Sequence, residues 1–221
     1  MGKLFPPKDS SERIKRIRNV HIEGLILMVI LMIMLSSALL LMGRMFFDMI
    51  FFSTDFGAEL MYSNQDELTE MIESGNMYDM LNYEPEFEPL YYAYTTTTKI
   101  LSTAGYVMAF VSMAGCIILL IFMKNDCRRI ASDSSPVENS VSVKKTAYVW
   151  LGFLLGCFGG QLFLYHSKKA WYFLGLGIVG LFFPIFILYT TGISFADAFA
   201  ACFMQKDEEG MITIEDYQYW I

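Results

Sequence analysis

Histidine and cysteine are scarce in this sequence, and each shortage excludes a class of protein. Its two histidines, His21 and His166, are too few to build a His-rich metal site. No cysteine falls in residues 53–98, so this segment has no disulfide, and a disulfide-stapled scaffold is excluded. The four cysteines lie elsewhere: Cys116, Cys127, Cys157 and Cys202.

Charged residues are absent from long stretches of the chain, in four apolar runs of which the first is uncharged through Gly43. The chain is 55 % hydrophobic, above the roughly 45–50 % of soluble domains, and about 20 apolar residues suffice to cross a bilayer as a helix. The sequence therefore predicts an all-α integral membrane protein with four transmembrane helices. The expected segments are a basic cytoplasmic leader (1–23), a first helix (24–52), an acidic exterior segment (53–98), a second helix (99–123), a cytoplasmic loop (124–145), a helical hairpin (146–203) and a cytoplasmic tail (204–221).

Within the hairpin, the expected spans are residues 146–165 and 170–192. Pro184 lies inside the second of these, where a span helix tolerates it as a kink. A cleaved signal peptide is the competing interpretation of the first run. We favour an uncleaved anchor, because that run exceeds the usual apolar length of about 7–15 residues and lacks a clear cleavage site.

The distribution of lysine and arginine predicts the orientation. The leader, the loop 124–145 and the tail hold twelve basic residues, against three in the expected exterior parts, which are Lys99, Lys168 and Lys169. Because cytoplasmic loops are enriched in lysine and arginine, both termini are expected in the cytoplasm. The four-residue hairpin tip from His166 to Lys169 is then expected outside.

The exterior segment 53–98 carries ten acidic residues and no lysine or arginine. Asn64 is a suitable cap for a short amphipathic helix over residues 65–74, and the chain from Glu84-Pro85 through Glu88-Pro89 is expected to be extended. Two interpretations stay open. The segment is either a solvated acidic cap on the outer ends of the spans or a surface for docking or ligand sensing.

Glycine recurs at intervals of four in the third run, at Gly152, Gly156 and Gly160. Such spacing places the glycines on one helical face, where small residues let membrane helices approach closely. We expect this face to pack against the fourth run, with Gln161 as a polar contact across the hairpin.

The stretch from Leu155 to Tyr165 (LGCFGGQLFLY) resembles the core of the TM2 domain, a pair of membrane helices joined by a short loop. Gly156, Gly159 and Phe163 match its glycine and phenylalanine frame, whereas Gln161 and Leu162 replace its charged pair. The resemblance covers about residues 144–203, and Asp197 is similar in place to an acid of the family's second helix. It implies a bacterial membrane protein with no assigned reaction.

Two polar features remain. Arg44 and Asp48 lie one turn apart in the first run and are expected to form a local ion pair near the membrane surface. The tail is expected to turn at residues 206–210 and to form a strand at Met211–Ile214. An EF-hand alignment of the tail places Gln205 and Asp216 where Asp and Glu are required, which disfavours calcium. The loop 131–142 is polar and is expected to lack regular structure.

No nucleophile lies beside a base and no phosphate-binding loop follows a strand, so the sequence predicts neither an enzyme nor a cofactor. We expect a non-enzymatic scaffold or subunit of a membrane assembly. Its expected partners are the lipid bilayer and a membrane protein, a cytoplasmic protein or a second copy, and nucleic acid is not expected. The alternative is a surface sensor that uses the acidic segment. Three aromatic residues of the tail are candidate partner contacts: Tyr217, Tyr219 and Trp220.

Overall fold

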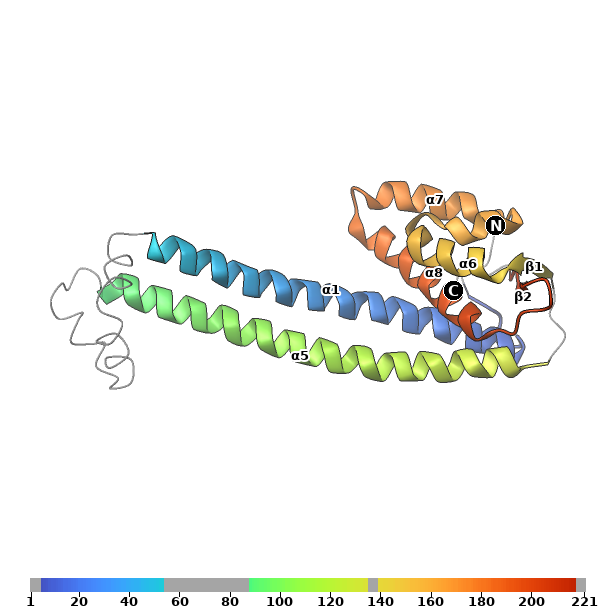
Figure 1. Ribbon diagram of the computed structural model, residues 1–221, viewed down its shortest axis with the longest axis horizontal. Helices are drawn as coiled ribbons and strands as arrows, with labels where there is room; N and C mark the ends of the chain where they lie inside the picture. Colours follow the sequence, from blue (N-terminus) through green and yellow to red (C-terminus); the bar gives the residue numbers. More distant parts are fainter. Residues whose placement is uncertain (1–4, 54–87, 135–138, 218–221) are drawn as a thin grey trace. The chain divides into compact units, whose positions relative to one another are not determined.

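The computed structural model describes residues 5–53, 88–134 and 139–217, and most of them are helical (Figure 1). The chain divides into two compact units. The first comprises Met1–Met32 and Ala114–Ile221, and the second comprises Ile33–Met113. The expected helix at residues 65–74 and most of the acidic segment lie outside the described residues.

Two helices are much longer than the predicted spans. Helix α1 runs over Glu12–Phe52 and α5 over Glu88–Ser132, so they are about 60 and 70 Å long, respectively. Helix α1 therefore starts inside the predicted leader, and α5 starts inside the predicted exterior segment. The expectation that Glu88-Pro89 is extended is wrong, because proline is tolerated in the first turn of a helix, where its missing N–H needs no partner.

Three described helices are long and apolar enough to cross a bilayer: Glu12–Phe51 within α1, Tyr92–Ser132 within α5, and Pro184–Phe203, which is α8. The most apolar window is 44 % buried in α8, against 17 % in α1 and 11 % in α5. Helix α8 is thus the one on which other segments pack, while α1 and α5 expose most of their apolar surface.

The third predicted span is not a single helix. Helix α6 covers Lys145–Leu154 and is followed by two 3₁₀ helices, η1 (Gly156–Phe158) and η2 (Gly160–Tyr165). Ten helical residues reach only about 15 Å, half of the hydrocarbon thickness. The break follows from Gly159, whose left-handed φ of 71° is readily adopted by glycine.

The fourth predicted span is also divided. Helix α7 covers Lys169–Gly180, and α8 covers Pro184–Phe203. Pro184 is therefore not a kink inside a helix but the start of α8, and Phe183 before it is extended (φ −128°, ψ 90°). The physical reason is that proline favours the first helical position and pushes the preceding residue out of the helical region.

A small antiparallel sheet corrects the all-α prediction. Strand β1 (Ser140–Lys144) pairs with β2 (Met211–Glu215), with Val141 opposite Ile214 and Val143 opposite Ile212. The predicted strand in the tail is confirmed, and Gly210 before it has the expected turn conformation (φ 77°). The loop 131–142 is not wholly irregular, because α5 ends at Ser132 and β1 starts at Ser140.

In the first unit, α8 packs on α1, α6 and α7. A Cβ atom on Gly24 of α1 would lie 2.5 Å from the Gly192 carbonyl oxygen of α8, so the two backbones cross in direct contact. Next to this crossing, Val20, Leu27 and Ala196 belong to one buried apolar cluster. Small residues allow this approach, which lets membrane helices pack without a hydrophobic driving force.

The second unit contains the remaining parts of α1 and α5. The Tyr94 ring stacks on Phe51 with centroids 3.8 Å apart, and its hydroxyl donates to the Asp48 carboxylate at 3.0 Å. Further along, a Cβ on Gly105 would meet Leu41 at 2.8 Å. The predicted Arg44–Asp48 ion pair is present at 3.6 Å.

Candidate functional site

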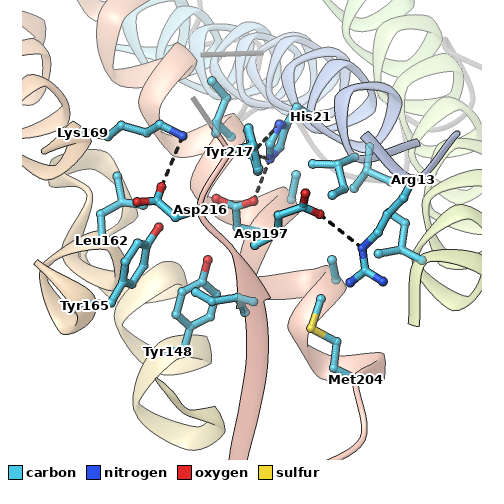
Figure 2. Close-up of a pocket in the computed structure, with 18 of the residues that line it drawn as sticks. Arg13, His21, Tyr148, Leu162, Tyr165, Lys169, Asp197, Met204, Asp216 and Tyr217 are labelled. Carbon is cyan, nitrogen blue, oxygen red and sulfur yellow. Dashed lines mark hydrogen bonds and ion pairs between the residues drawn. The ribbon is translucent and has the colours of Figure 1, made fainter. Parts of the chain in front are cut away.

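A polar cavity of about 60 Å³ lies in the first unit, where side chains from α1, α6, η2, α7, α8 and β2 converge (Figure 2). Water needs roughly 10–15 Å³ of such space, so the cavity has room for about four waters. Drug-sized ligands occupy pockets of roughly 300–1,000 Å³. Its ionisable lining residues are Arg13, His21, Tyr148, Tyr165, Lys169, Asp197, Glu215, Asp216 and Tyr217. We call this set the polar clamp.

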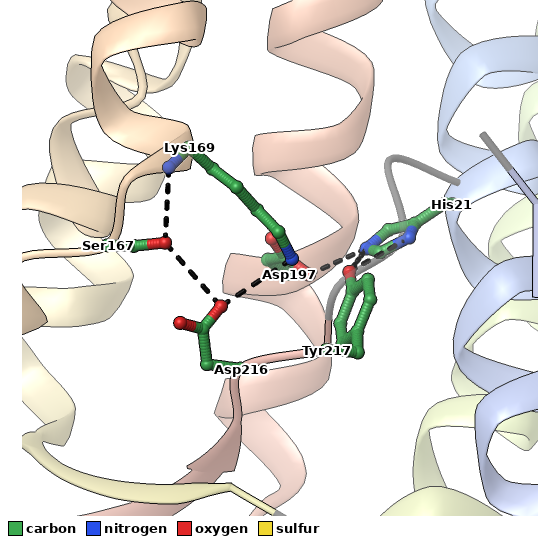
Figure 3. A network of polar contacts seen from close by, with 6 residues as sticks. All are labelled: His21, Ser167, Lys169, Asp197, Asp216 and Tyr217. Atoms are coloured by element: carbon green, nitrogen blue, oxygen red, sulfur yellow. Dashed lines mark hydrogen bonds and ion pairs between the residues drawn. The ribbon is translucent and has the colours of Figure 1, made fainter. Parts of the chain in front are cut away.

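The centre of the polar clamp is His21 of α1. Its Nε2 atom lies 2.7 Å from the Asp197 carboxylate of α8, and the Tyr217 hydroxyl lies 2.9 Å from Nε2 and 3.1 Å from Nδ1 (Figure 3). Both ring nitrogens therefore have a polar partner within hydrogen-bond distance, and Nε2 is shared between Asp197 and Tyr217. One imidazole thereby joins α1, α8 and the tail.

A second contact joins α1 to the tail. The Arg13 guanidinium lies 3.4 Å from the Glu215 carboxylate, and the two side chains are only 9 % and 7 % exposed. Arg13 also donates to the backbone carbonyl of Asp133 at 3.0 Å. Because a buried ion pair needs further hydrogen bonds to offset its desolvation, the contact with Asp133 is part of what makes this pair tenable.

A third contact joins α7 to the tail. Lys169 Nζ lies 3.5 Å from the Asp216 carboxylate and 4.2 Å from the centre of the Tyr217 ring. Ser167 bridges the two elements, since its hydroxyl donates to Asp216 and accepts from the Lys169 amide (Figure 3). Burial lowers the pKa of Lys169, and the carboxylates of Asp216 and Asp197 oppose this effect.

The position of Lys169 corrects the predicted hairpin tip. Residues 166–169 were expected on the opposite side of the membrane from the tail, yet Lys169 contacts Asp216 of the tail and lines the same cavity as Arg13. Tyr148 of α6 and Tyr165 of η2 line this cavity too. The chain from α6 to η2 therefore leaves the polar clamp and returns to it.

A serine and a threonine of α8 stabilise the break between α6 and η1. Ser194 donates its hydroxyl to the Gly156 carbonyl at 2.8 Å, and Thr190 donates to the Cys157 carbonyl at 2.8 Å. Carbonyls freed by a broken helix are costly in an apolar setting unless they are paired. Helix α8 thus supplies the partners that the divided segment lacks.

The glycines predicted to pack have different neighbours. A Cβ on Gly152 or Gly156 would lie 2.7 Å from Ala198 or Ser194 of α8, respectively. A Cβ on Gly159 would meet Phe173 of α7, whereas one on Gly160 would meet Leu155 just before it in the chain. Of the three glycines spaced by four, Gly152 and Gly156 therefore pack on α8, whereas Gly160 does not.

The remaining predicted site residues, which are Phe163, Gln161 and the three aromatic residues of the tail, have different surroundings. Phe163 packs edge-on against Trp171 of α7, with ring centroids 5.7 Å apart. Gln161 is fully buried, and neither of its amide atoms has a hydrogen-bond partner within the described ranges. The hydrogen bond expected for Gln161 across the hairpin is thus missing there. Tyr219 and Trp220 lie outside the described residues, while Tyr217 is part of the polar clamp.

The polar clamp offers little for catalysis. A tyrosine beside a histidine and an aspartate resembles a nucleophile with its base and orienting acid, but burial, together with the nearby Asp197 carboxylate, raises the pKa of Tyr217 well above its ordinary value. The phenol therefore keeps its proton. Among the described residues, no cluster of histidine, cysteine and carboxylate side chains suits a metal ion.

Sequence reasoning did not find the polar clamp. His21 is 176 residues from Asp197 and 196 residues from Tyr217, so no local spacing relates them. The sequence held one signal that could have indicated this cluster. His21 lies just before the first apolar run and Asp197 lies after the last, and ionisable residues in such apolar surroundings are candidate functional residues by default.

No protein-family model, no curated protein and no solved structure matches this chain. The resemblance to the TM2 domain therefore stays a prediction that rests on residues 144–203.

Proposed function

We propose that this chain is a non-enzymatic subunit or scaffold of a membrane assembly, with both ends of the described chain on the cytoplasmic side. The observation that carries the proposal is the polar clamp. Its ionisable groups contact one another, and each pair joins segments that are far apart in the sequence: Arg13 with Glu215, His21 with Asp197, and Lys169 with Asp216.

The small volume of the cavity supports this function. Space for about four waters leaves no room for a substrate, while ion pairs and hydrogen bonds around the cavity join α1, α7, α8 and the tail. Groups arranged in this way fix the relative positions of membrane segments. A surface whose segments are already fixed loses less conformational freedom when a partner subunit binds to it.

The charge distribution supports the orientation. Lys168 and Lys169 were the exceptions to the basic bias when residues 166–169 were assigned to the outside. With Lys169 beside the tail, these two lysines join the other twelve, which makes fourteen basic residues on one side and leaves Lys99 alone on the other. The enrichment of lysine and arginine on the cytoplasmic side then has one exception, Lys99, instead of three.

The orientation is tested by labelling single cysteines on intact cells with a membrane-impermeant thiol reagent, in a chain whose four native cysteines are replaced by serine. We expect Ser74→Cys to be labelled, and Ser134→Cys and Lys168→Cys to be labelled only after the cells are opened. Labelling of Lys168→Cys on intact cells would contradict the proposal.

The subunit role is tested by purifying the chain in mild detergent. We expect a stoichiometric partner or a defined homo-oligomer. We expect this association to be lost in Arg13→Met, which breaks the polar clamp, and kept in Lys8→Gln, which changes an exposed lysine outside it. A folded wild-type chain that purifies as a monomer without partners would refute the role.

A further inference from the structure

A second hollow lies where α6 begins and α8 ends, and it has a different character. It is open, has a volume of about 360 Å³, and shares no lining residue with the polar clamp. Three lysines line it, Lys144, Lys145 and Lys206, together with Thr146, Trp150 and Cys202. No acidic residue is among the lining residues, so its electrostatic potential favours an anion.

The three lysines have different roles. Lys145 Nζ donates to the backbone carbonyls of Cys202 and Met204, at 2.9 and 2.8 Å, and so closes the end of α8. An ammonium has three donors, which leaves one for a ligand. Lys144 and Lys206 are exposed, and neither forms an ion pair with any residue that the structure describes. Two positive charges therefore line this hollow without an ion-pair partner among the described residues, although Asp207, Glu208 and Glu209 follow Lys206 directly in the chain.

The first turn of α6 adds to the attraction for an anion. Lys144 is the residue before the helix, and no side chain caps the amides that follow it. The Lys145 amide donates to the Gly210 carbonyl at 3.1 Å, so the amides available to an anion begin with that of Thr146. Uncapped amides at a helix start carry partial positive charge and bind anionic oxygens. The Thr146 hydroxyl lies in this turn, on an exposed residue, and supplies a further donor.

An apolar stripe leads away from the hollow. Thr146, Trp150 and Leu154 follow one another at intervals of four along α6, so they share one face. Trp150 is 60 % exposed and Leu154 is 70 % exposed. Tryptophan is enriched at the membrane surface, at the level of the lipid headgroups. The face thus changes from cationic to aromatic to aliphatic, as a phospholipid changes from its phosphate to its acyl chains.

We propose that this hollow binds the phosphate of an anionic phospholipid, with an acyl chain along Trp150 and Leu154. A free phosphate ion would contact the lysines but has no apolar part to pack on the stripe. Basic pockets next to membrane helices bind anionic headgroups in this manner. The inference needs the chain to lie in a bilayer but does not depend on the subunit role.

The test is native mass spectrometry of the full chain in detergent, with phosphatidylglycerol or phosphatidylcholine of the same acyl chains added. We expect the wild type to retain one phosphatidylglycerol about 30-fold more strongly than phosphatidylcholine. The double variant Lys144→Gln/Lys206→Gln should weaken phosphatidylglycerol binding by roughly 30-fold, at about a fivefold loss for each lysine. Binding of phosphatidylcholine should not change.

The matched control is Lys8→Gln/Lys168→Gln, which removes the same charge from exposed lysines outside the hollow. It should bind phosphatidylglycerol like the wild type, and Lys144→Arg/Lys206→Arg should retain most of the binding. Equal losses in the control and test variants would overturn the proposal in favour of general charge attraction. Displacement of phosphatidylglycerol by millimolar inorganic phosphate would overturn it in favour of a free-anion site.

Discussion

Each of the two units contains an arginine paired with a carboxylate, and the two pairs differ in almost every respect. In the first unit, Arg13 and Glu215 are 9 % and 7 % exposed and come from α1 and β2. In the second, Arg44 and Asp48 are 40 % and 29 % exposed and lie one turn apart on α1. The first pair is therefore part of the tertiary structure, whereas the second accompanies a helix that forms without it.

This difference extends to the surroundings of the pairs. Arg13 belongs to the polar clamp, where hydroxyl, imidazole and carboxylate groups from distant segments meet. Asp48 has one further described partner, the Tyr94 hydroxyl, at 3.0 Å. Burial makes a polar group dependent on its partners, so the first unit should be far more sensitive to single changes than the second.

The largest effect is expected for Arg13→Met. It leaves the Glu215 carboxylate buried without its counter-ion, and breaking a buried pair costs about 3–5 kcal/mol. The free energy of unfolding, measured by reversible titration with SDS in mixed micelles, should fall by about 3 kcal/mol or more. A loss of unfolding free energy below about 1 kcal/mol would show that water solvates the Arg13–Glu215 pair. The pair would then contribute no more than the exposed Arg44–Asp48 pair does.

The next effect concerns two glycines of the first unit. Gly156→Ala places a Cβ about 2.7 Å from that of Ser194, in a contact that α8 must give way to. Overpacking of this kind costs about 1–3 kcal/mol. Gly175→Ala is the matched control, since its Cβ would have no neighbour within 4 Å, and it should be neutral or stabilising by up to about 1 kcal/mol. Equal effects in SDS titration would contradict the packing at Gly156.

A smaller effect concerns alkaline pH. Burial raises the pKa of Tyr217 in the folded chain above the value of about 10 that holds when the chain is unfolded. Above pH 10 the unfolded state therefore loses a proton that the folded state keeps, and stability falls as pH rises, by up to about 1.4 kcal/mol per pH unit for this group.

The comparison variant for alkaline pH is Tyr217→Phe. It should be less stable than the wild type at pH 8, because the hydroxyl contact with His21 is lost. Between pH 10 and 11 its stability should fall less steeply than that of the wild type. Melting temperatures at pH 8, 10 and 11 measure both effects, and parallel curves above pH 10 would show that Tyr217 titrates freely.

The smallest effect is expected in the second unit. Arg44→Met removes a half-exposed local pair, and such pairs contribute about 0–1 kcal/mol. The change in the free energy of unfolding should therefore be below about 1 kcal/mol, in the same titration used for Arg13→Met. A loss similar to that of Arg13→Met would remove the distinction between the two units.

The sequence predicted the helices and the strand whose formation depends on residues close together in the chain. Uninterrupted apolar runs indicated the helices around residues 24–52 and 99–123, and alternation after a glycine indicated the strand at Met211. The partner strand β1 was missed, because its pairing joins Ser140 to Glu215 and its residues look like a polar loop. The ends of α1 and α5 were missed as well, since charged residues continue a helix without changing its backbone preference.

Hydropathy also misled the prediction of two spans. The run from Thr146 to Tyr165 is apolar throughout, yet Gly159 allows the chain to reverse, and Ser194 and Thr190 of α8 satisfy the carbonyls that this exposes. A sliding average of hydrophobicity measures affinity for lipid, not the direction of the chain. Only the three-dimensional arrangement relates Ser194 to Gly156.

The long separation between the two sides of the polar clamp has a consequence during synthesis. Tyr217 follows His21 by 196 residues, and chains grow at about 5–20 residues per second, so about 10–40 s separate the appearance of these two partners at the ribosome. Throughout that interval Arg13 and His21 are present in a growing chain that lacks Glu215 and Tyr217. Water, lipid headgroups or an insertion factor must accommodate them until translation supplies their lasting contacts.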